Sequence, residues 1–160
     1  MYDGPLPDLA SEIRDPRLAR LYAYWLERKG ARRYPGRRDL DPVDLRYVLG
    51  HLMLLDVLRD PLRFRFRLHG ARITSRVRYD LTGKLLDELP DPAYRDYAIG
   101  RCKAVVASGA PLVVRHSRML DGQPWAYEAL WLPLSEDGSE ITMLLCAMIY
   151  EDRQRRRPVS

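Results

Sequence analysis

The sequence has few cysteines and no long apolar run. Its two cysteines, Cys102 and Cys146, are too few for a disulfide framework and too far apart for a zinc site. The longest apolar run, Met143–Ile149, has seven residues, whereas a membrane span needs about 20. The first residues, Met1–Pro5, lack the charged and apolar segments of a secretory signal. We therefore expect one soluble, cytoplasmic domain without a membrane span, since 160 residues can bury a sizeable core.

Lysine is also scarce, with three among the 27 basic residues, which is typical of a GC-rich genome. The net charge of +5 is unevenly distributed. Residues 14–38 hold nine basic and two acidic residues, and 153–157 hold four arginines, whereas 39–152 hold fourteen basic and seventeen acidic residues. We interpret the basic segments as solvated flanks, so the sequence does not favour a nucleic-acid partner.

The first strong pattern predicts a helix over residues 15–30. Asp15 is a good N-cap, Pro16 suits the first helical position, and Gly30 ends the helix. Its apolar stripe at helical spacing contains Leu18, Leu21, Tyr22, Trp25 and Leu26. This stripe needs a partner surface. That surface is either the domain's own sheet or the same helix of a second subunit, which would give a homodimer.

The remaining pattern predicts an α+β domain with a five-stranded antiparallel sheet. Helices are predicted over 41–50 and 91–108, and helical turns over 71–78 and 85–89. Apolar or alternating runs predict strands over 51–58, 64–68, 112–120, 124–134 and 141–150. In the fourth strand, Tyr127 and Trp131 share one face and Glu128 the other. We divide the chain into a helical extension (1–50), a sheet domain (51–150) and a basic tail (151–160).

This order of two strands, a helical crossover and three strands resembles the PAS fold. Asp80–Leu89, with Thr82-Gly83, resembles the PAS loop that leads into a short helix. Tyr127–Leu134, followed by Asp137-Gly138, is similar to the penultimate strand and loop of a bacterial subfamily of small, stand-alone PAS proteins with a helical N-terminal extension. The resemblance covers residues 15–150 and implies a sensing or signalling module.

The resemblance does not predict haem or a photoactive flavin, and the identity of any cofactor stays open. A photoactive flavin domain needs a reactive cysteine just before the crossover helix, but residues 71–90 contain none. Haem-binding PAS domains commonly use a histidine on the long helix, and residues 91–108 contain none. We expect structural roles for His51, His69 and His116, because they lack ligand partners at metal spacing, and therefore no metal site.

The resemblance also implies a cavity between the inner face of the sheet and the crossover helices, apolar with a few polar groups. Its candidate residues are Phe66, Leu68, Arg72, Ile73, Tyr79, Tyr97, Arg101, His116, Arg118, Trp125, Tyr127 and Met148. The alternative, that these side chains simply fill the core, stays open. If a ligand binds, Arg72 or Arg118 would suit a carboxylate or phosphate.

We therefore expect a non-catalytic PAS sensor that binds a small molecule, a signalling protein or both, with its output in trans. The alternative is a small-molecule enzyme on the cone-shaped fold of ketosteroid isomerase-like proteins. That enzyme would use Glu128 or His116 as its acid or base, although Glu128 can instead pair with Arg115 or Arg118 on the neighbouring strand. The strand order separates the two folds, because a PAS sheet places its last strand beside its first.

Overall fold

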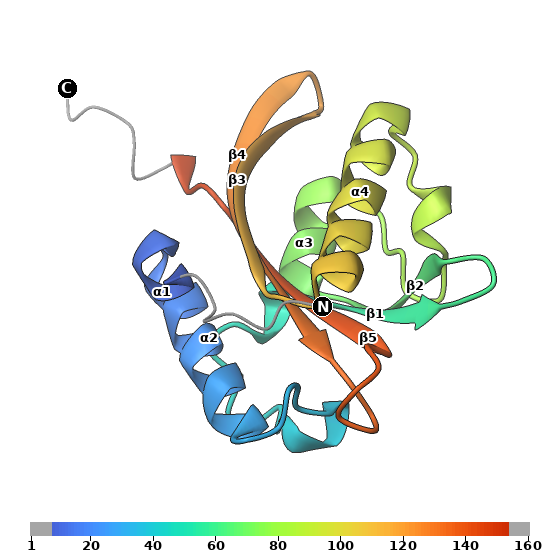
Figure 1. The fold of residues 1–160 in the computed structure, drawn as a ribbon. Helices are drawn as coiled ribbons and strands as arrows, with labels where there is room; N and C mark the ends of the chain where they lie inside the picture. Colours follow the sequence, from blue (N-terminus) through green and yellow to red (C-terminus); the bar gives the residue numbers. More distant parts are fainter. Residues whose placement is uncertain (1–7, 154–160) are drawn as a thin grey trace.

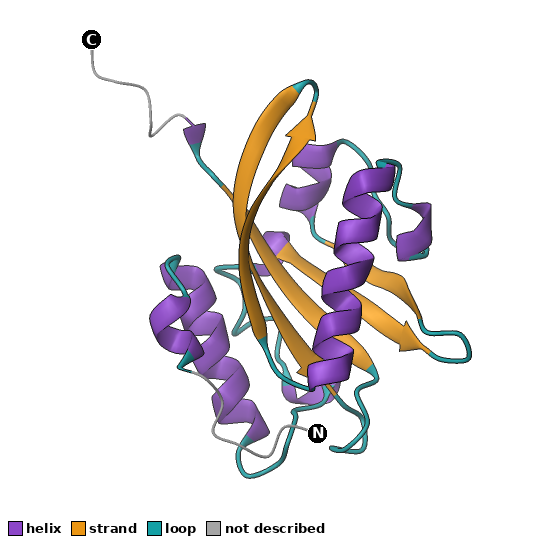
Figure 2. Ribbon diagram, turned by 45° about the horizontal axis from the view of Figure 1, so that its top comes forward, coloured by secondary structure: helices purple, strands orange, loops and turns teal. Residues whose placement is uncertain are grey.

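The computed structural model describes residues 8–153 and shows a five-stranded antiparallel sheet with helices on both faces (Figure 1). Helices α3 and α4 cover the inner face, and α1 and α2 cover the outer face (Figure 2). The α-helices are α1 (Leu9–Glu12), α2 (Pro16–Lys29), α3 (Ala71–Val77) and α4 (Pro92–Ser108). The 3₁₀ helices are η1 (Arg37–Asp39), η2 (Leu49–His51) and η3 (Leu86–Glu88). The strands are β1 (Leu52–Leu58), β2 (Arg63–His69), β3 (Leu112–Leu120), β4 (Gln123–Leu134) and β5 (Met143–Tyr150).

The sheet order is β2-β1-β5-β4-β3, so the last strand lies between the first and the fourth. This confirms the predicted PAS topology, with β5 beside β1, and contradicts the cone-shaped alternative. Seven consecutive residues of β5, from Met143 to Ile149, are buried. A central strand covered on both faces explains why this segment is apolar throughout.

Helix α2 confirms the predicted capping and packs its apolar stripe on the chain's own sheet. The Asp15 side chain accepts a hydrogen bond from the backbone N–H of Arg17, and Gly30 caps the other end with a positive φ of 55°. Trp25 is 1% exposed, and its Nε1 donates to the carbonyl of Pro133 in β4 at 3.0 Å. The other stripe residues predicted to face a partner are buried as well, namely Leu18, Leu21 and Tyr22. Of the two alternatives, the helix thus uses its own sheet, and a homodimer would need another surface.

The predicted α-helix over 41–50 is wrong, because this segment forms successive tight turns that lead into η2. Its backbone bonds join residues three apart: Leu45 N–H to the carbonyl of Pro42, and Val48 N–H to that of Leu45. Leu45 and Val48 are buried, whereas Val43 is exposed. Burying a pair of residues three apart suits the three residues per turn of a 3₁₀ helix.

The described residues contain no helix that is long and apolar enough to cross a membrane. The first seven residues and most of the predicted basic tail, 154–160, lie outside the described residues.

Candidate functional site

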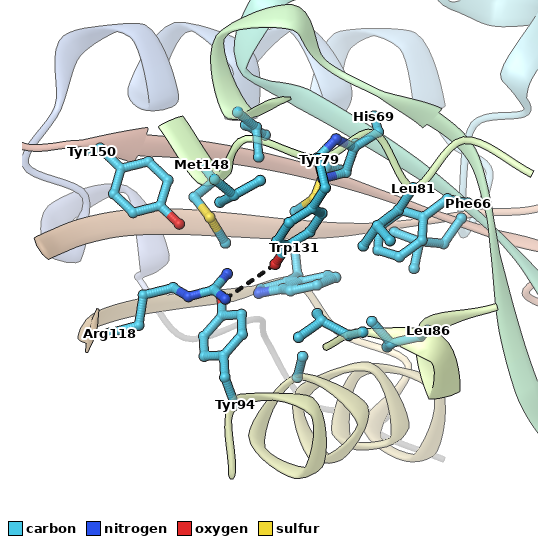
Figure 3. Close-up of a pocket in the computed structure, with 16 residues that line it drawn as sticks. Phe66, His69, Tyr79, Leu81, Leu86, Tyr94, Arg118, Trp131, Met148 and Tyr150 are labelled. Carbon is cyan, nitrogen blue, oxygen red and sulfur yellow. Dashed lines mark hydrogen bonds between the residues drawn. The ribbon is translucent and has the colours of Figure 1, made fainter. Parts of the chain in front are cut away.

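A small cavity lies between the inner face of the sheet and the helices α3 and α4 (Figure 3). Its volume is about 30 Å³, which is about the share of one water molecule in the liquid. Side chains from the sheet and from the helices pack around this cavity and leave no larger space in it. The apolar part of the lining includes Met53, Leu55, Leu86, Leu89 and Ala98.

Five of the candidate pocket residues line this cavity, namely Phe66, Ile73, Tyr79, Arg118 and Met148. Tyr127 lies next to it, where its hydroxyl accepts a hydrogen bond from the Tyr94 hydroxyl at 3.1 Å. The other candidates lie elsewhere in the structure.

Leu68 does not share the inner face with Phe66, because β2 contains an irregularity. Leu54 pairs with Leu68 and Leu55 with Phe66, which leaves Arg67 as an extra residue on β2. An extra residue of this kind reverses the alternation of the strand beyond it. Leu68 is consequently 38% exposed, and His69 is buried in the cavity wall instead.

Arg72 and Trp125 lie outside the cavity as well. Arg72 lines an outer groove with Arg46 and His51. The ring of Trp125 lies between two guanidinium groups, with Arg76 Cζ at 3.9 Å and Arg153 Cζ at 3.7 Å from its centroid. Trp125 therefore stacks with cations near the tip of the β3–β4 hairpin.

Tyr97, Arg101 and His116 form a separate cluster between α4 and β3. The rings of Tyr97 and His116 stack with centroids 3.9 Å apart, and Arg101 Cζ lies 5.2 Å from the Tyr97 centroid. None of the three lines the cavity, so His116 is not placed to act as an acid or base inside it.

Arg118 is the charged residue of the cavity lining and is only 8% exposed. Its guanidinium lies over the ring of Tyr94, with Cζ 3.7 Å from the centroid, and its Nη2 donates to the Tyr79 hydroxyl at 3.1 Å. Its buried Nε has no hydrogen-bond partner. Within residues 8–153, no carboxylate forms an ion pair with it.

Two further polar groups of the lining are buried without a hydrogen-bond partner, the indole Nε1 of Trp131 and the hydroxyl of Tyr150. Burial raises the pKa of Tyr150, an effect that the positive charge of Arg118 opposes, and burial also raises the pKa of Tyr94 well above its ordinary value. Both hydroxyls are therefore protonated near neutral pH. Sequence reasoning missed Trp131, although it shares a strand face with Tyr127, and it had no signal for Tyr150.

His69 completes the polar lining and was also missed, because the irregularity in β2 could not be read from the alternation. Its Nδ1 lies 2.7 Å from the Thr74 hydroxyl. Burial lowers the pKa of His69; the charge of Arg118 lowers it further, while Asp80 opposes both effects. His69 is thus neutral near neutral pH, and the guanidinium of Arg118 supplies the cavity's one full charge.

Glu128 lies on the outer face of the sheet and not in the cavity. Its Oε2 is 2.6 Å from Nη1 of Arg115, the residue directly opposite in β3. This confirms one of the two predicted pairings. The position also separates Glu128 from the site that the enzyme alternative assigned to it.

The cavity does not fit a flavin or a haem. Sites for ligands of that size occupy about 300–1,000 Å³, which is at least tenfold more than the space present. Both cysteines are fully buried, and burial raises the pKa of each thiol far above its ordinary value, so neither is a reactive thiolate. The described part of the chain holds no cluster of three or more potential metal-ligating side chains.

The comparisons with known structures agree with this topology. A light-oxygen-voltage domain studied with a flavin analogue has a TM-score of 0.53 and 13% identity, over 71% of this chain and 85% of that chain. The Rhodobacter sphaeroides LOV protein has a TM-score of 0.51 and 13% identity, over 73% of this chain and 72% of that chain. The dark structure of the Aureochrome1 LOV photoreceptor has a TM-score of 0.51 and 13% identity, over 72% of this chain and 86% of that chain. At this identity the likeness concerns the fold alone.

No curated protein matches the chain. A sequence model of the PAS_5 family, described as a PAS domain, matches residues 13–149. This match includes helix α2, strands β1 to β4 and all of β5 except Tyr150, and it agrees with the sheet order and with the structural neighbours. The chain belongs to the PAS domain family.

Proposed function

We propose that this chain is a non-catalytic, cytoplasmic sensor module. It binds a small molecule in the core cavity and passes the signal to a separate protein. Family membership supports a sensory signalling role. The observation that carries the ligand part is the set of buried donors without acceptors on the cavity wall, Arg118 Nε, Trp131 Nε1 and the Tyr150 hydroxyl. Buried polar groups are almost always hydrogen-bonded, so an unmatched set indicates a missing partner.

The position of these groups suits a sensor. Arg118 lies on β3, and its guanidinium contacts Tyr79, which follows α3, and Tyr94 in the first turn of α4. A ligand that engages the guanidinium competes with or reinforces both contacts. A ligand shifts a conformational equilibrium only through such differential contacts, so binding here would alter how α3 and α4 sit on the sheet.

In this proposal the output is delivered in trans by a separate protein, and the PAS match over residues 13–149 supports the sensing part. Docking to a signalling protein and homodimerisation are both ways to deliver such an output. The apolar stripe of α2 is already used within the chain, so we expect either interaction to use another surface, such as the polar face of α2 or the tip of the β3–β4 hairpin.

The test is a thermal-shift screen of small molecules on the full chain, compared with a variant whose cavity is filled. Ala98 lines the cavity on α4 and is buried, whereas Ala107 is exposed on the same helix. We expect at least one compound to stabilise the wild type and Ala107→Val in a saturable manner but not Ala98→Val. Absence of any stabilising compound, or equal stabilisation of Ala98→Val, would overturn the ligand-binding function.

A further inference from the structure

Among residues 8–153, no carboxylate forms an ion pair with Arg118. Removing an ion from water costs several kcal/mol, and buried charges are therefore normally paired with an opposite charge. The neighbours of the Arg118 guanidinium include the ring of Tyr94 and the hydroxyls of Tyr79 and Tyr150, which are all neutral. In the part of the chain that the structure describes, no aspartate or glutamate contacts it.

Each unmatched group beside Arg118 can donate a hydrogen bond. An indole Nε1–H and an arginine Nε–H can only donate, whereas the protonated Tyr150 hydroxyl can also accept one from the neighbouring Arg118 guanidinium. They come from the adjacent strands β3, β4 and β5, and Figure 3 shows the guanidinium, the indole nitrogen and the hydroxyl directed toward the same part of the cavity. A cation flanked by neutral donors is complementary to an anion. A water molecule could accept hydrogen bonds here but would leave the positive charge uncompensated.

The rest of the lining restricts which anion fits. One guanidinium balances one negative charge, so a phosphate dianion would remain partly uncompensated. Much of the remaining wall is apolar and includes Leu55, Phe66 and Ile73, and such a wall favours a ligand with a small hydrocarbon part. The volume of about 30 Å³ is close to that of one water molecule, so a carboxylate can enter only if lining side chains move, and this limits the ligand to a short chain.

We infer that the cavity binds a short-chain monocarboxylate, whose carboxylate is held by Arg118, Trp131 and Tyr150 and whose hydrocarbon part faces Phe66 and Ile73. The inference rests on the proposed sensor function and names the chemical class of its ligand. Binding would convert an unpaired buried charge into an ion pair with hydrogen bonds to both flanking donors.

The experiment is a titration of the full chain, followed by NMR or thermal shift, with formate, acetate, propionate and butyrate. Acetamide and propionamide serve as neutral isosteres, and chloride and phosphate as inorganic anions. We expect saturable binding of at least one carboxylate, with the matching amide at least about tenfold weaker, because a hydrogen bond to a charged group is worth about 1.5–3 kcal/mol. Equal binding of acid and amide, or binding of chloride or phosphate as tight as that of the best carboxylate, would overturn the inference.

Variants test the three donors separately. Arg118→Met should weaken carboxylate binding at least about tenfold, and Trp131→Phe or Tyr150→Phe, which keep the ring and remove one donor, severalfold each. Arg101→Met removes an arginine outside the cavity and should bind as the wild type does. Unchanged affinity in both aromatic variants would refute the site even if Arg118→Met fails to fold.

Native mass spectrometry of the purified chain separates this inference from the function on which it rests. A neutral compound retained by the wild type and lost in Ala98→Val would keep the sensor function and reject the carboxylate. If no compound of any class is retained in native mass spectrometry or binds in the thermal-shift screen, both the sensor function and the carboxylate inference are rejected.

Discussion

Arg115 and Glu128 face each other across the β3–β4 pair, with Nη1 and Oε2 2.6 Å apart, on the face of the sheet opposite the cavity. The Glu128 carboxylate also accepts hydrogen bonds from the backbone N–H groups of Arg14, at 3.0 Å, and Asp15, at 2.8 Å. Arg115 in turn donates to the carbonyl of Glu12. One buried carboxylate therefore ties the start of α2 to the sheet.

Glu128→Ala is expected to destabilise the protein by about 2–4 kcal/mol, because it leaves two backbone donors and a guanidinium without their acceptor. Urea unfolding checks this value. The matched control is Glu140→Ala, which removes a largely exposed salt bridge to Arg59 and should cost less than about 1 kcal/mol. Similar losses in the two variants would show that Glu128 does not anchor α2.

Gly70→Ala is expected to be strongly destabilising, whereas Gly100→Ala should be stabilising. A Cβ on Gly70 would lie 2.7 Å from the carbonyl oxygen of Leu52 and would also collide with that of Gly50. These are backbone atoms at the junction of η2, β1 and α3, so the conflict cannot be relieved by a side-chain rotation. We expect a loss of about 2 kcal/mol or more.

Gly100 lies within α4, and a Cβ there meets no atom within 4 Å. Alanine has the higher helix propensity, so Gly100→Ala should raise the free energy of unfolding by about 0.5–1 kcal/mol. Chemical denaturation measures both variants. A neutral Gly70→Ala would contradict the close approach of the two backbone segments.

The stability of the protein should fall as the pH decreases from 7 to 5.5. The pKa of His69 in the folded protein is lowered from its ordinary value of 6.5 by burial and by the charge of Arg118, and those of His51 and His116 are lowered as well. Below pH 6.5 these histidines are protonated in the unfolded chain, whereas in the folded protein they stay neutral until the pH falls further. Each such histidine can therefore cost up to about 1.4 kcal/mol per pH unit.

His69→Asn tests the contribution of His69, since an amide can keep a hydrogen bond to Thr74 without titrating. Its free energy of unfolding should depend less steeply on pH between 7 and 5.5 than that of the wild type. Unfolding curves at several pH values in this window measure the slope. An unchanged slope would show that His69 is protonated equally in both states.

Arg118→Met should not destabilise the protein in a carboxylate-free buffer, and it should raise the free energy of unfolding by up to about 2 kcal/mol. The substitution keeps an apolar stem and removes a buried charge that has no anionic partner, and such replacements are often neutral or stabilising. A ligand at 100 times its Kd should then add about 2.7 kcal/mol to the wild type alone. A loss of more than about 2 kcal/mol without ligand would show that the stacking on Tyr94 makes Arg118 a structural residue.

The sequence determined most elements of this protein, with the helix predicted over 41–50 as an exception, because the signals of these elements act over a few residues. Asp91 caps α4 through the backbone N–H of Ala93, and Gly109 ends this helix with a φ of 68°. The alternation in β4 placed Glu128 on one face and Tyr127 on the other, as the structure confirms. The order of these elements resembles that of PAS domains, and this resemblance implied the pairing of β5 with β1 that the sheet order confirms.

Only the tertiary structure decided which side chains meet in the cavity. Because of the extra residue in β2, His69 and not Leu68 lies on the inner face. The register of three strands brings Arg118, Trp131 and Tyr150 together. Strand register and irregularities are selected by packing over the whole sheet, and a shift of one residue reverses every side chain beyond it. Local patterns could therefore propose an arginine for the site, but only the folded chain showed that no carboxylate of residues 8–153 pairs with Arg118.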